Sequence, residues 1–418
     1  MEAVRFDELQ LDERIVRAVT DMGFEAASPI QAQAIPVQLE GLDIIGQAQT
    51  GTGKTAAFGI PLVQMIDPED ERVQAIVLCP TRELAIQAAD ELRRYAKYLP
   101  GVKVLPVYGG QDIEKQIRSL RGKVSIVVGT PGRVMDHMRR HTLKLEGIRM
   151  VVLDEADEML NMGFVEDIET ILAGVPENHQ TALFSATMPA KIQQLANTIL
   201  NDPSEIKLAV SKPAEKIIQA AYVCYENQKL GIIRSLFMDE VPERVIVFAS
   251  SKIKVKEVAK ALKSMKLNVG EMHSDLEQAQ RETVMHEFKA GRINILVATD
   301  IVARGIDIDD IRLVINFDVP HDSEDYVHRI GRTARANNDG VALTFINEKE
   351  QSNFKSIENF LEKEIYKIPI PEGLGEAPEY KPRSFNKNRN GNFSKRKDFR
   401  GKRNNGGKKS NYPAPRQK

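Results

Sequence analysis

The sequence of 418 residues contains little cysteine and histidine and no long hydrophobic run. The two cysteines, Cys79 and Cys224, lie far apart in apolar stretches, which favours buried reduced thiols over a disulfide. The seven histidines show no metal-ligand spacing, so a structural zinc site is not indicated. No apolar run is long enough to span a bilayer, and the first residues lack the apolar core of a signal peptide. We therefore expect a cytoplasmic protein with no membrane partner.

Positive charge is concentrated at one end of the chain. The formal net charge is only −1, yet residues 380–418 hold 14 Lys and Arg against one acidic residue, Asp398. This stretch is rich in Asn and Gly and has almost no aliphatic residues, which predicts disorder. Its spaced aromatic residues, beginning with Tyr380, suit stacking on unpaired bases between phosphate contacts. RNA contact is favoured here, and the alternative is a solubilising tail with incidental charge.

A glycine-rich loop at residues 48–55 follows an apolar stretch and leads into a helical pattern. Gly51 and Gly53 allow backbone N–H groups to turn toward an anion. Lys54 suits the outer phosphates of a nucleotide, and the Thr55 hydroxyl suits Mg²⁺ at the start of the helix. The usual phosphate-loop spacing has Gly where this chain has Ala48. On its own, therefore, the loop leaves a chance glycine-rich turn open.

Two adjacent carboxylates later in the chain strengthen the prediction of a nucleotide site. An apolar stretch at residues 151–153 ends at Asp154 and Glu155. Asp154 suits Mg²⁺ binding, and Glu155 suits the positioning of an attacking water. The alternative for both side chains is a solvated strand end. A phosphate loop and an acid pair in this order predict a nucleoside triphosphate site with Mg²⁺ and a water-activating base.

Strand-like and helix-like patterns alternate along most of the chain, which predicts parallel sheets covered on both faces. Helical periodicity is clear at residues 83–98. The polar segment 209–216 interrupts the alternation, which then resumes without a second phosphate loop. Apolar strand-like runs occupy residues 75–79, 124–128, 150–153, 181–184, 220–224, 244–248, 293–297, 313–317 and 341–346. We predict an α/β fold with an ATP-binding domain at 1–208, a linker at 209–216, a second domain at 217–370 and a disordered basic tail at 371–418. We expect the ligands to bind at the carboxyl ends of the strands, in a cleft to which the second domain contributes groups.

An ordered series of motifs resembles the DEAD-box RNA helicases from about residue 6 to residue 346. Two positions depart from the family pattern, because Ala334 and Ser274 stand where Gly is commoner. The matching segments are Phe6 with residues 23–31, then 80–85, 109–110, 130–133, 154–157 and 185–187, followed by 247–248, 278–281, 299–307 and 328–335. The resemblance implies two tandem RecA-like domains and an ATP-dependent RNA helicase that works as a monomer.

The resemblance also implies which residues serve the nucleotide. Gln31 pairs with an adenine edge, with a helix-surface Gln as the alternative, and Phe6 covers the ring, with core packing as the alternative. Arg332 and Arg335 share a helix face and stabilise charge on the γ-phosphate. The catalytic set is Lys54, Asp154, Glu155, Arg332 and Arg335, and the metal ligands are Thr55 and Asp154. The cofactor-binding set, which overlaps with these, is Phe6, Gln31, Thr50, Gly51, Thr52, Gly53, Lys54, Thr55 and Asp307.

Further residues are implied to couple the nucleotide to domain closure and to bind RNA. Asp157 is expected to hydrogen-bond toward Ser185 and Thr187, and His328 to link to the same acidic segment. The RNA-binding set is Thr81, Arg82, Gly110, Thr130, Arg133, Gln278, Arg281, Thr299 and Gly305. These groups suit phosphates and sugars, which predicts little sequence preference, and contacts to 2′-hydroxyls would favour RNA over DNA.

The function implied is local, non-processive unwinding of short RNA duplexes and remodelling of RNA–protein complexes, driven by ATP. Two alternatives from other classes remain open at this point. One is a DNA translocase of the same superfamily, and the other is an RNA clamp that locks on with ATP but does not unwind. A basic run at residues 395–403 also resembles a nuclear signal.

Overall fold

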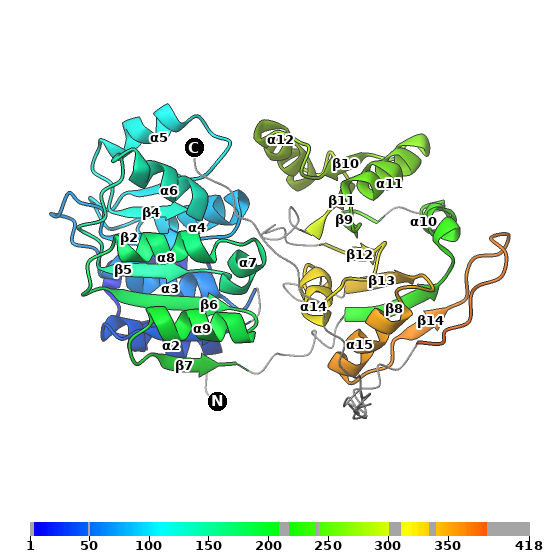
Figure 1. Ribbon diagram of the computed structural model, residues 1–418, viewed down its shortest axis with the longest axis horizontal. Coiled ribbons are helices and arrows are strands. Elements are labelled where there is room, and N and C mark those ends of the chain that lie inside the picture. The colour runs from blue at the N-terminus through cyan, green and yellow to red at the C-terminus, as the bar shows by residue number, and fades with distance from the viewer. Residues whose placement is uncertain are drawn as a thin grey trace, which may run out of the picture. The chain divides into compact units, whose positions relative to one another are not determined.

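The computed structural model describes residues 4–48, 51–208, 217–238, 242–300, 311–333 and 340–382. The described residues belong to one compact unit that ends at Pro382. They form two seven-stranded parallel sheets with helices packed on both faces of each sheet (Figure 1). The predicted α/β class with two tandem RecA-like domains is therefore confirmed. Within the described ranges, no helix is both long and apolar enough to cross a membrane.

The first sheet has the strand order β3-β4-β2-β5-β6-β1-β7. Its strands are β1 (Ile44–Gln47), β2 (Ala75–Leu78), β3 (Val104–Val107), β4 (Ile126–Gly129), β5 (Met150–Leu153), β6 (Gln180–Ser185) and β7 (Ser204–Lys207). The helices of this domain are η1 (Phe6–Glu8), α1 (Glu13–Asp21), α2 (Pro29–Leu39), α3 (Lys54–Gln64), α4 (Arg82–Tyr95), α5 (Ile113–Leu120), α6 (Pro131–Arg139), α7 (Ala156–Asn161), α8 (Val165–Ala173) and α9 (Ala190–Ile199).

Side chains from alternate positions of the central strands form two separate cores, one on each face of the first sheet. On one face, Ile44 and Val77 pack with Phe58 of α3 and Leu92 of α4. On the other face, side chains of α6 to α9 pack against the intervening strand residues, such as Ile45 and its register partner Leu183. Because both faces are buried, the central strands are apolar at nearly every position.

The second sheet repeats this plan with the order β10-β11-β9-β12-β13-β8-β14. Helices α10 and α11 cover one of its faces, and α12, α14 and α15 cover the other. The strands are β8 (Ile217–Val223), β9 (Val245–Phe248), β10 (Val269–Met272), β11 (Ile295–Ala298), β12 (Leu313–Asn316), β13 (Gly340–Ile346) and β14 (Tyr366–Ile368). The helices are η2 (Glu226–Gln228), α10 (Lys229–Leu236), α11 (Lys252–Ser264), α12 (Gln278–Lys289), α14 (Ser323–Ile330) and α15 (Gln351–Leu361).

Residues 371–382, which the sequence predicts as part of a disordered tail, instead have a defined course over the second domain. The Gln228 side-chain amide donates to the carbonyl oxygens of Leu374 (2.8 Å) and Glu376 (3.0 Å). Tyr380 was predicted to stack on bases, but its ring packs edge-on against Phe354 with the centroids 6.5 Å apart. This segment is ordered because it covers apolar side chains of the domain, a tertiary effect that its own composition does not reveal. The residues beyond 382 lie outside the described part of the chain.

Candidate nucleotide and RNA sites

The phosphate loop, the acid pair and an arginine of the second domain meet at one cavity of about 430 Å³. Lys54 is the first residue of α3, whereas Asp154 and Glu155 directly follow β5. These positions follow the carboxyl ends of β1 and β5, the two strands on either side of β6 in the same parallel sheet, and α/β sheets bind ligands at this edge. The predicted site residues that line the cavity are Gln31, Gly51, Thr52, Gly53, Lys54, Thr55, Asp154, Glu155 and Arg332. Thr50, Asp307 and Arg335 lie outside the described residues.

Lys54 and Glu155 form a buried ion pair in this cavity. The Lys54 Nζ lies 2.9 Å from the Glu155 Oε1, and the two side chains are 5% and 11% exposed. Burial alone would raise the pKa of Glu155, but the charge and hydrogen bond of Lys54, together with other nearby positive groups such as Arg332, lower that pKa. Glu155 also has a left-handed backbone (φ 53°), a conformation that is costly for a residue other than Gly. The site thus holds Glu155 as a carboxylate at a fixed place beside the phosphate loop.

Asp154 has the opposite electrostatic character. Its burial and the adjacent Glu155 charge raise the pKa of Asp154 to about 7. No described group hydrogen-bonds the buried Oδ1 of Asp154. A buried carboxylate oxygen without a protein partner, in the same cavity as the Thr55 hydroxyl, fits a hard divalent cation such as Mg²⁺.

Gln31 binds the phosphate loop itself. Its Nε2 donates to the Gly53 carbonyl oxygen at 3.1 Å, and its Oε1 accepts from the Ser28 backbone N–H at 2.9 Å. The Ser28 hydroxyl donates to the Thr52 carbonyl oxygen at 2.8 Å. Gly53 has φ 91°, and a Cβ there would lie 2.2 Å from the Gln31 Nε2, so only Gly fits. The adenine-reading role of Gln31 stays a prediction.

Phe6 lies behind the cavity wall. Its side chain is only 4% exposed and belongs to the core of the first domain. The Phe6 ring stacks on the ring of Phe24, with centroids 6.2 Å apart, and Phe24 lines the cavity. Sequence reasoning did not single out Phe24, although it lies in the matched segment 23–31. Covering of an adenine by Phe6 stays a prediction.

Asp157 makes the hydrogen bonds that the sequence predicts. Its Oδ2 accepts from both the backbone N–H and the hydroxyl of Thr187, each at 2.9 Å. The Ser185 hydroxyl lies 3.3 Å from the Asp157 backbone N–H, which donates to it. His328 lines a second cavity, of about 400 Å³, with Asp157 and Thr187. Burial lowers the pKa of His328 more than the nearby Glu155 and Asp157 charges raise it, so its imidazole is neutral at neutral pH.

A third and larger cavity, of about 720 Å³, is lined by loops at the carboxyl ends of strands from both sheets. Gly110 packs closely against Arg82, which lines this cavity. A Cβ at Gly110 would be only 2.2 Å from the Arg82 Nη1. Burial, followed by the positive charges of Arg281 and Arg133, lowers the pKa of Arg82. The predicted RNA-binding residues that line the cavity are Thr81, Arg82, Thr130, Arg133, Arg281 and Thr299. The Gln278 side chain and Gly305 lie outside the described part of the chain.

Some lining residues were missed by the sequence reasoning. Lys252 and Arg139 add positive charge to the 720 Å³ cavity, and Glu91 of α4 lines the 430 Å³ cavity near Asp154. Lys252 begins α11, just after the carboxyl end of β9. The position of Lys252 indicates a site residue, because the ligands are expected at the carboxyl ends of the strands. Arg139 and Glu91 lie inside or at the end of helices, where sequence gives no such signal.

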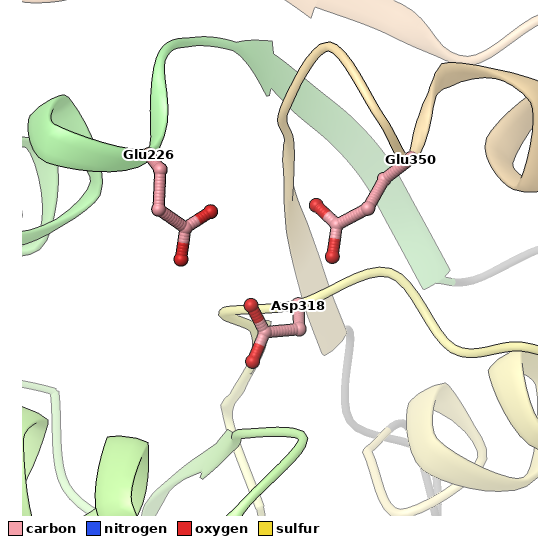
Figure 2. Close-up of side chains that lie close together, drawn as sticks. All are labelled: Glu226, Asp318 and Glu350. Atoms are coloured by element: carbon pink, nitrogen blue, oxygen red, sulfur yellow. The ribbon is translucent and has the colours of Figure 1, made fainter.

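The equivalent edge of the second sheet carries a buried ion network instead of a phosphate loop. Figure 2 shows the carboxylates of Glu226, Asp318 and Glu350 facing one another. The Lys229 Nζ is fully buried and lies 2.9 Å from the Asp318 Oδ1 and 3.1 Å from both the Glu226 and Glu350 carboxylates. The Lys254 Nζ contacts Asp318 at 2.5 Å and Glu226 at 2.6 Å. These two ammonium groups supply positive charge among the carboxylates, so we assign no metal to them.

The Lys229–Asp318 pair repeats the Lys54–Glu155 pair of the first domain. β8 and β12 hold the same places in the second sheet that β1 and β5 hold in the first. Lys229 begins the helix after β8, and Asp318 follows β12. In the second domain three protein carboxylates therefore surround the lysine at the place where the first domain has its 430 Å³ cavity.

Two RecA-like domains, with a phosphate loop and acid pair in the first and an arginine of the second lining the same cavity, define an ATPase of the helicase type. The DEAD/DEAH box helicase family matches residues 28–195, and the helicase conserved C-terminal domain matches residues 228–337. The chain belongs to the DEAD-box ATP-dependent RNA helicases, a family of RNA-stimulated ATPases.

Individual relatives agree with this assignment. The DEAD-box ATP-dependent RNA helicase CshA of Bacillus subtilis is 48% identical over 377 residues, which cover 90% of this chain and 76% of CshA. Among solved structures, S. cerevisiae Dbp5 bound to RNA and ADP BeF3 is similar with a TM-score of 0.81 and 32% identity, covering 88% of this chain and 96% of that one. Mss116p bound to ssRNA and AMP-PNP is similar with a TM-score of 0.80 and 29% identity, covering 89% and 81%.

Proposed function

We propose that ATP turnover in the 430 Å³ cavity drives local, non-processive unwinding of short RNA duplexes bound at the 720 Å³ cavity. The observation that supports this most is that residues of both domains line both cavities. Lys54 of the first domain and Arg332 of the second line one, whereas Arg82 and Arg281 line the other. Any change in one domain relative to the other therefore alters the nucleotide site and the RNA site together.

In the nucleotide site, the backbone of residues 51–53 and the Lys54 ammonium would hold the phosphates. ATP binding would transfer Lys54 from Glu155 to the phosphates, which leaves the Glu155 carboxylate to accept a proton from the attacking water. Arg332, with Arg335, would stabilise the charge that develops on the γ-phosphoryl group. Asp154 and Thr55 would hold Mg²⁺, which when bound neutralises charge on the phosphates.

In the RNA site, the arginines and small polar groups would bind the phosphates and sugars of one strand. Gln278 and Gly305, from the same motif series, would complete the set. Bending that strand would prevent it from staying paired. Each duplex step is worth about 1.4 kcal/mol on the DNA scale, so melting a few steps releases a short duplex without long translocation. Remodelling of RNA–protein complexes follows from the same displacement.

We also propose the coarser organisation that the sequence predicts. Residues 209–216 would be the linker between the two domains, and the basic residues after 382 would contact RNA phosphates. The protein would act as a monomer in the cytoplasm. The coupling set of Asp157, Ser185, Thr187 and His328 would link the nucleotide to the second domain, since Asp157, Thr187 and His328 line one cavity.

The substitution Glu155→Gln tests this function. The amide cannot accept the proton of the attacking water, so RNA-stimulated ATP hydrolysis should fall about 10²–10⁴-fold. ATP-dependent RNA binding should persist or tighten, because the variant keeps the shape of the site. Steady-state ATPase and fluorescence-based RNA binding measure the two effects, and unchanged turnover would refute the role of Glu155.

Strand displacement on a short duplex, together with ATPase stimulation by RNA and by DNA, separates the remaining alternatives. We expect ATP to release one strand of a short RNA duplex. We also expect DNA to stimulate the ATPase less than RNA of equal length does. Stimulation by DNA equal to that by RNA would indicate a DNA translocase. Tight RNA binding with ATP but no strand release would indicate a clamp.

A further inference from the structure

Gln116 lies outside every motif named above, yet it occupies the centre of a buried hydrogen-bond network beside the 720 Å³ cavity, the proposed RNA site. It belongs to α5 and is 2% exposed. Its Oε1 accepts from the Arg133 Nη1 at 2.9 Å and faces the His137 Nε2 at 3.0 Å. Its Nε2 donates to the Tyr108 carbonyl oxygen at 3.1 Å and to the Gln111 Oε1 at 2.7 Å. Both acceptor positions of the amide oxygen and both N–H donors of the amide nitrogen thus have a partner.

Arg133, whose guanidinium can only donate, fixes which way the Gln116 amide points, and His137 completes the arrangement. The His137 side chain is fully buried, and burial followed by the Arg133 charge lowers its pKa, so the imidazole is neutral near pH 7. The Nε2 faces an acceptor oxygen and must therefore carry the single N–H. The reversed amide would set its NH₂ group against the Arg133 guanidinium, which is always a donor. The oxygen of Gln116 is consequently held toward Arg133.

Gln116 in turn holds one end of the Arg133 guanidinium. The two hydrogens of the Arg133 Nη1 are taken by the Gln116 Oε1 and by the Gln111 carbonyl oxygen at 3.1 Å. Among the described residues, Arg133 lines the RNA cavity with Arg82 and Arg281. A phosphate in that cavity would meet the Nε and Nη2 hydrogens, which form the bidentate edge of a guanidinium. An amide acceptor orients Arg133 without neutralising it, whereas a carboxylate would compete with the phosphate.

We infer that Gln116 is a positioning residue for RNA: it orients Arg133 toward the backbone phosphate of a bound strand while leaving the arginine its full charge. The inference rests on the proposed function, because it requires the 720 Å³ cavity to bind RNA. Gln116 itself is too deeply buried to touch the strand. Its effect on RNA must therefore pass through Arg133, and that dependence can be measured.

A double-mutant cycle on the full-length protein tests this dependence. Affinity for a fluorescent single-stranded RNA, with a non-hydrolysable ATP analogue, is measured for wild type, Gln116→Ala, Arg133→Ala and the double variant. We expect Arg133→Ala to weaken binding about tenfold or more and Gln116→Ala about threefold to tenfold. The double variant should bind like Arg133→Ala alone, because Gln116 has then lost the group through which it acts. Ser119→Ala, on the exposed side of α5, is the matched control and should bind like wild type.

Each outcome decides a different point. Equal losses from Gln116→Ala in both backgrounds would overturn the inference, since Gln116 would then act through the packing of α5. Unchanged binding by Gln116→Ala beside weakened binding by Arg133→Ala would overturn it as well, while the proposed RNA site would stand. Unchanged binding by Arg133→Ala would overturn the RNA site and the inference with it.

A second substitution guards against a folding defect. If Gln116→Ala lowers the thermal midpoint, the cycle is repeated with Gln116→Glu, which keeps an acceptor oxygen for Arg133. The carboxylate should neutralise Arg133, weaken RNA binding and flatten its dependence on salt. These effects should again vanish in the Arg133→Ala background, and their persistence there would contradict the inference.

Discussion

At the scale of single residues, the Lys54–Glu155 pair sets the state of the proposed catalytic base. A buried lysine and carboxylate 2.9 Å apart neutralise each other, so neither is available until another group replaces one of them. The ATP phosphates are the natural replacement, because they attract Lys54 and repel Glu155. Binding of ATP would thus free the Glu155 carboxylate in the same step, and without ATP the carboxylate would stay paired with Lys54.

Gly110 gives a residue-scale prediction about RNA. Its φ is +85°, and a Cβ there would lie 2.2 Å from the Arg82 Nη1, so Gly110→Ala must move Arg82 or strain the backbone. We expect RNA binding to weaken about tenfold, as for the loss of one charge-assisted contact. At Gly109, by contrast, a Cβ would meet Arg82 at an ordinary 3.5 Å. Fluorescence titration of both variants with RNA checks this, and equal effects at the two positions would contradict it.

Residues in contiguous runs were the predictable part of the site. The phosphate loop follows from a short stretch whose chemistry is local, whereas the Asp157 hydrogen bonds to Ser185 and Thr187 join two segments and were implied by the family resemblance. The contacts of Gln31 and Gln116 were not predictable, because their partners come from other segments of the chain. Gln31 bonds to the loop at Gly53, and Gln116 orients Arg133. The position of a glutamine in the sequence does not indicate which donor or acceptor its side-chain amide contacts in the fold.

At the scale of elements, the strands that are buried on both faces were predictable from the sequence, and the edge strands were not. The central strands, such as β2 and β5, are buried at every position and read as apolar runs. The sequence reasoning missed β3, β7, β10 and β14, which are the edge strands of the two sheets. An edge strand needs less apolar surface, so β7 is Ser-Glu-Ile-Lys with one buried residue, and β3 tolerates Pro106.

The ion network of the second domain gives an element-scale prediction about stability and pH. Burial would raise the pKa of Asp318, but Lys229 and Lys254 outweigh it and hold that pKa well below its usual range. A carboxylate with a lowered pKa stabilises the folded state above its unfolded pKa, about 3.9, and loses that contribution as the pH falls further. Asp318→Asn removes the most buried of the three carboxylates around Lys229 and should cost about 3 kcal/mol at pH 7.

Denaturant unfolding at several pH values measures this contribution. The difference between wild type and Asp318→Asn should shrink as the pH falls below about 4, where the unfolded carboxylate binds a proton. Asp21→Asn removes an exposed pair with Lys97 and serves as the control, which should change stability little at any pH. A difference for Asp318→Asn that does not depend on pH would count against the network.

At the scale of the whole molecule, one sheet topology is used twice for two purposes. In the first domain the carboxyl edge keeps a phosphate loop, and in the second the corresponding lysine is sealed by carboxylates. The duplicated α/β plan was predictable from the alternation of patterns. The order of strands, and hence this correspondence, came only from the structure, because alternation alone does not fix which strands are neighbours.

The basic end of the chain gives a whole-molecule prediction. Removal of residues 383–418 takes away thirteen Lys and Arg and one Asp but keeps Tyr380, whose ring packs against Phe354. RNA affinity should fall, and the slope of log affinity against log salt concentration should become shallower, because fewer counterions are released. Titrations at several salt concentrations measure the slope. An unaltered slope would return these residues to a solubilising role.

The central claim is that an arginine of the second domain completes the ATP site of the first. Single-turnover hydrolysis of ATP, with and without saturating RNA, tests it most directly in wild type and in Arg332→Ala. RNA should accelerate the wild-type protein, whereas Arg332→Ala should hydrolyse about a thousandfold or more slowly with RNA present. Hydrolysis by Arg332→Ala at the wild-type rate in saturating RNA would contradict the account.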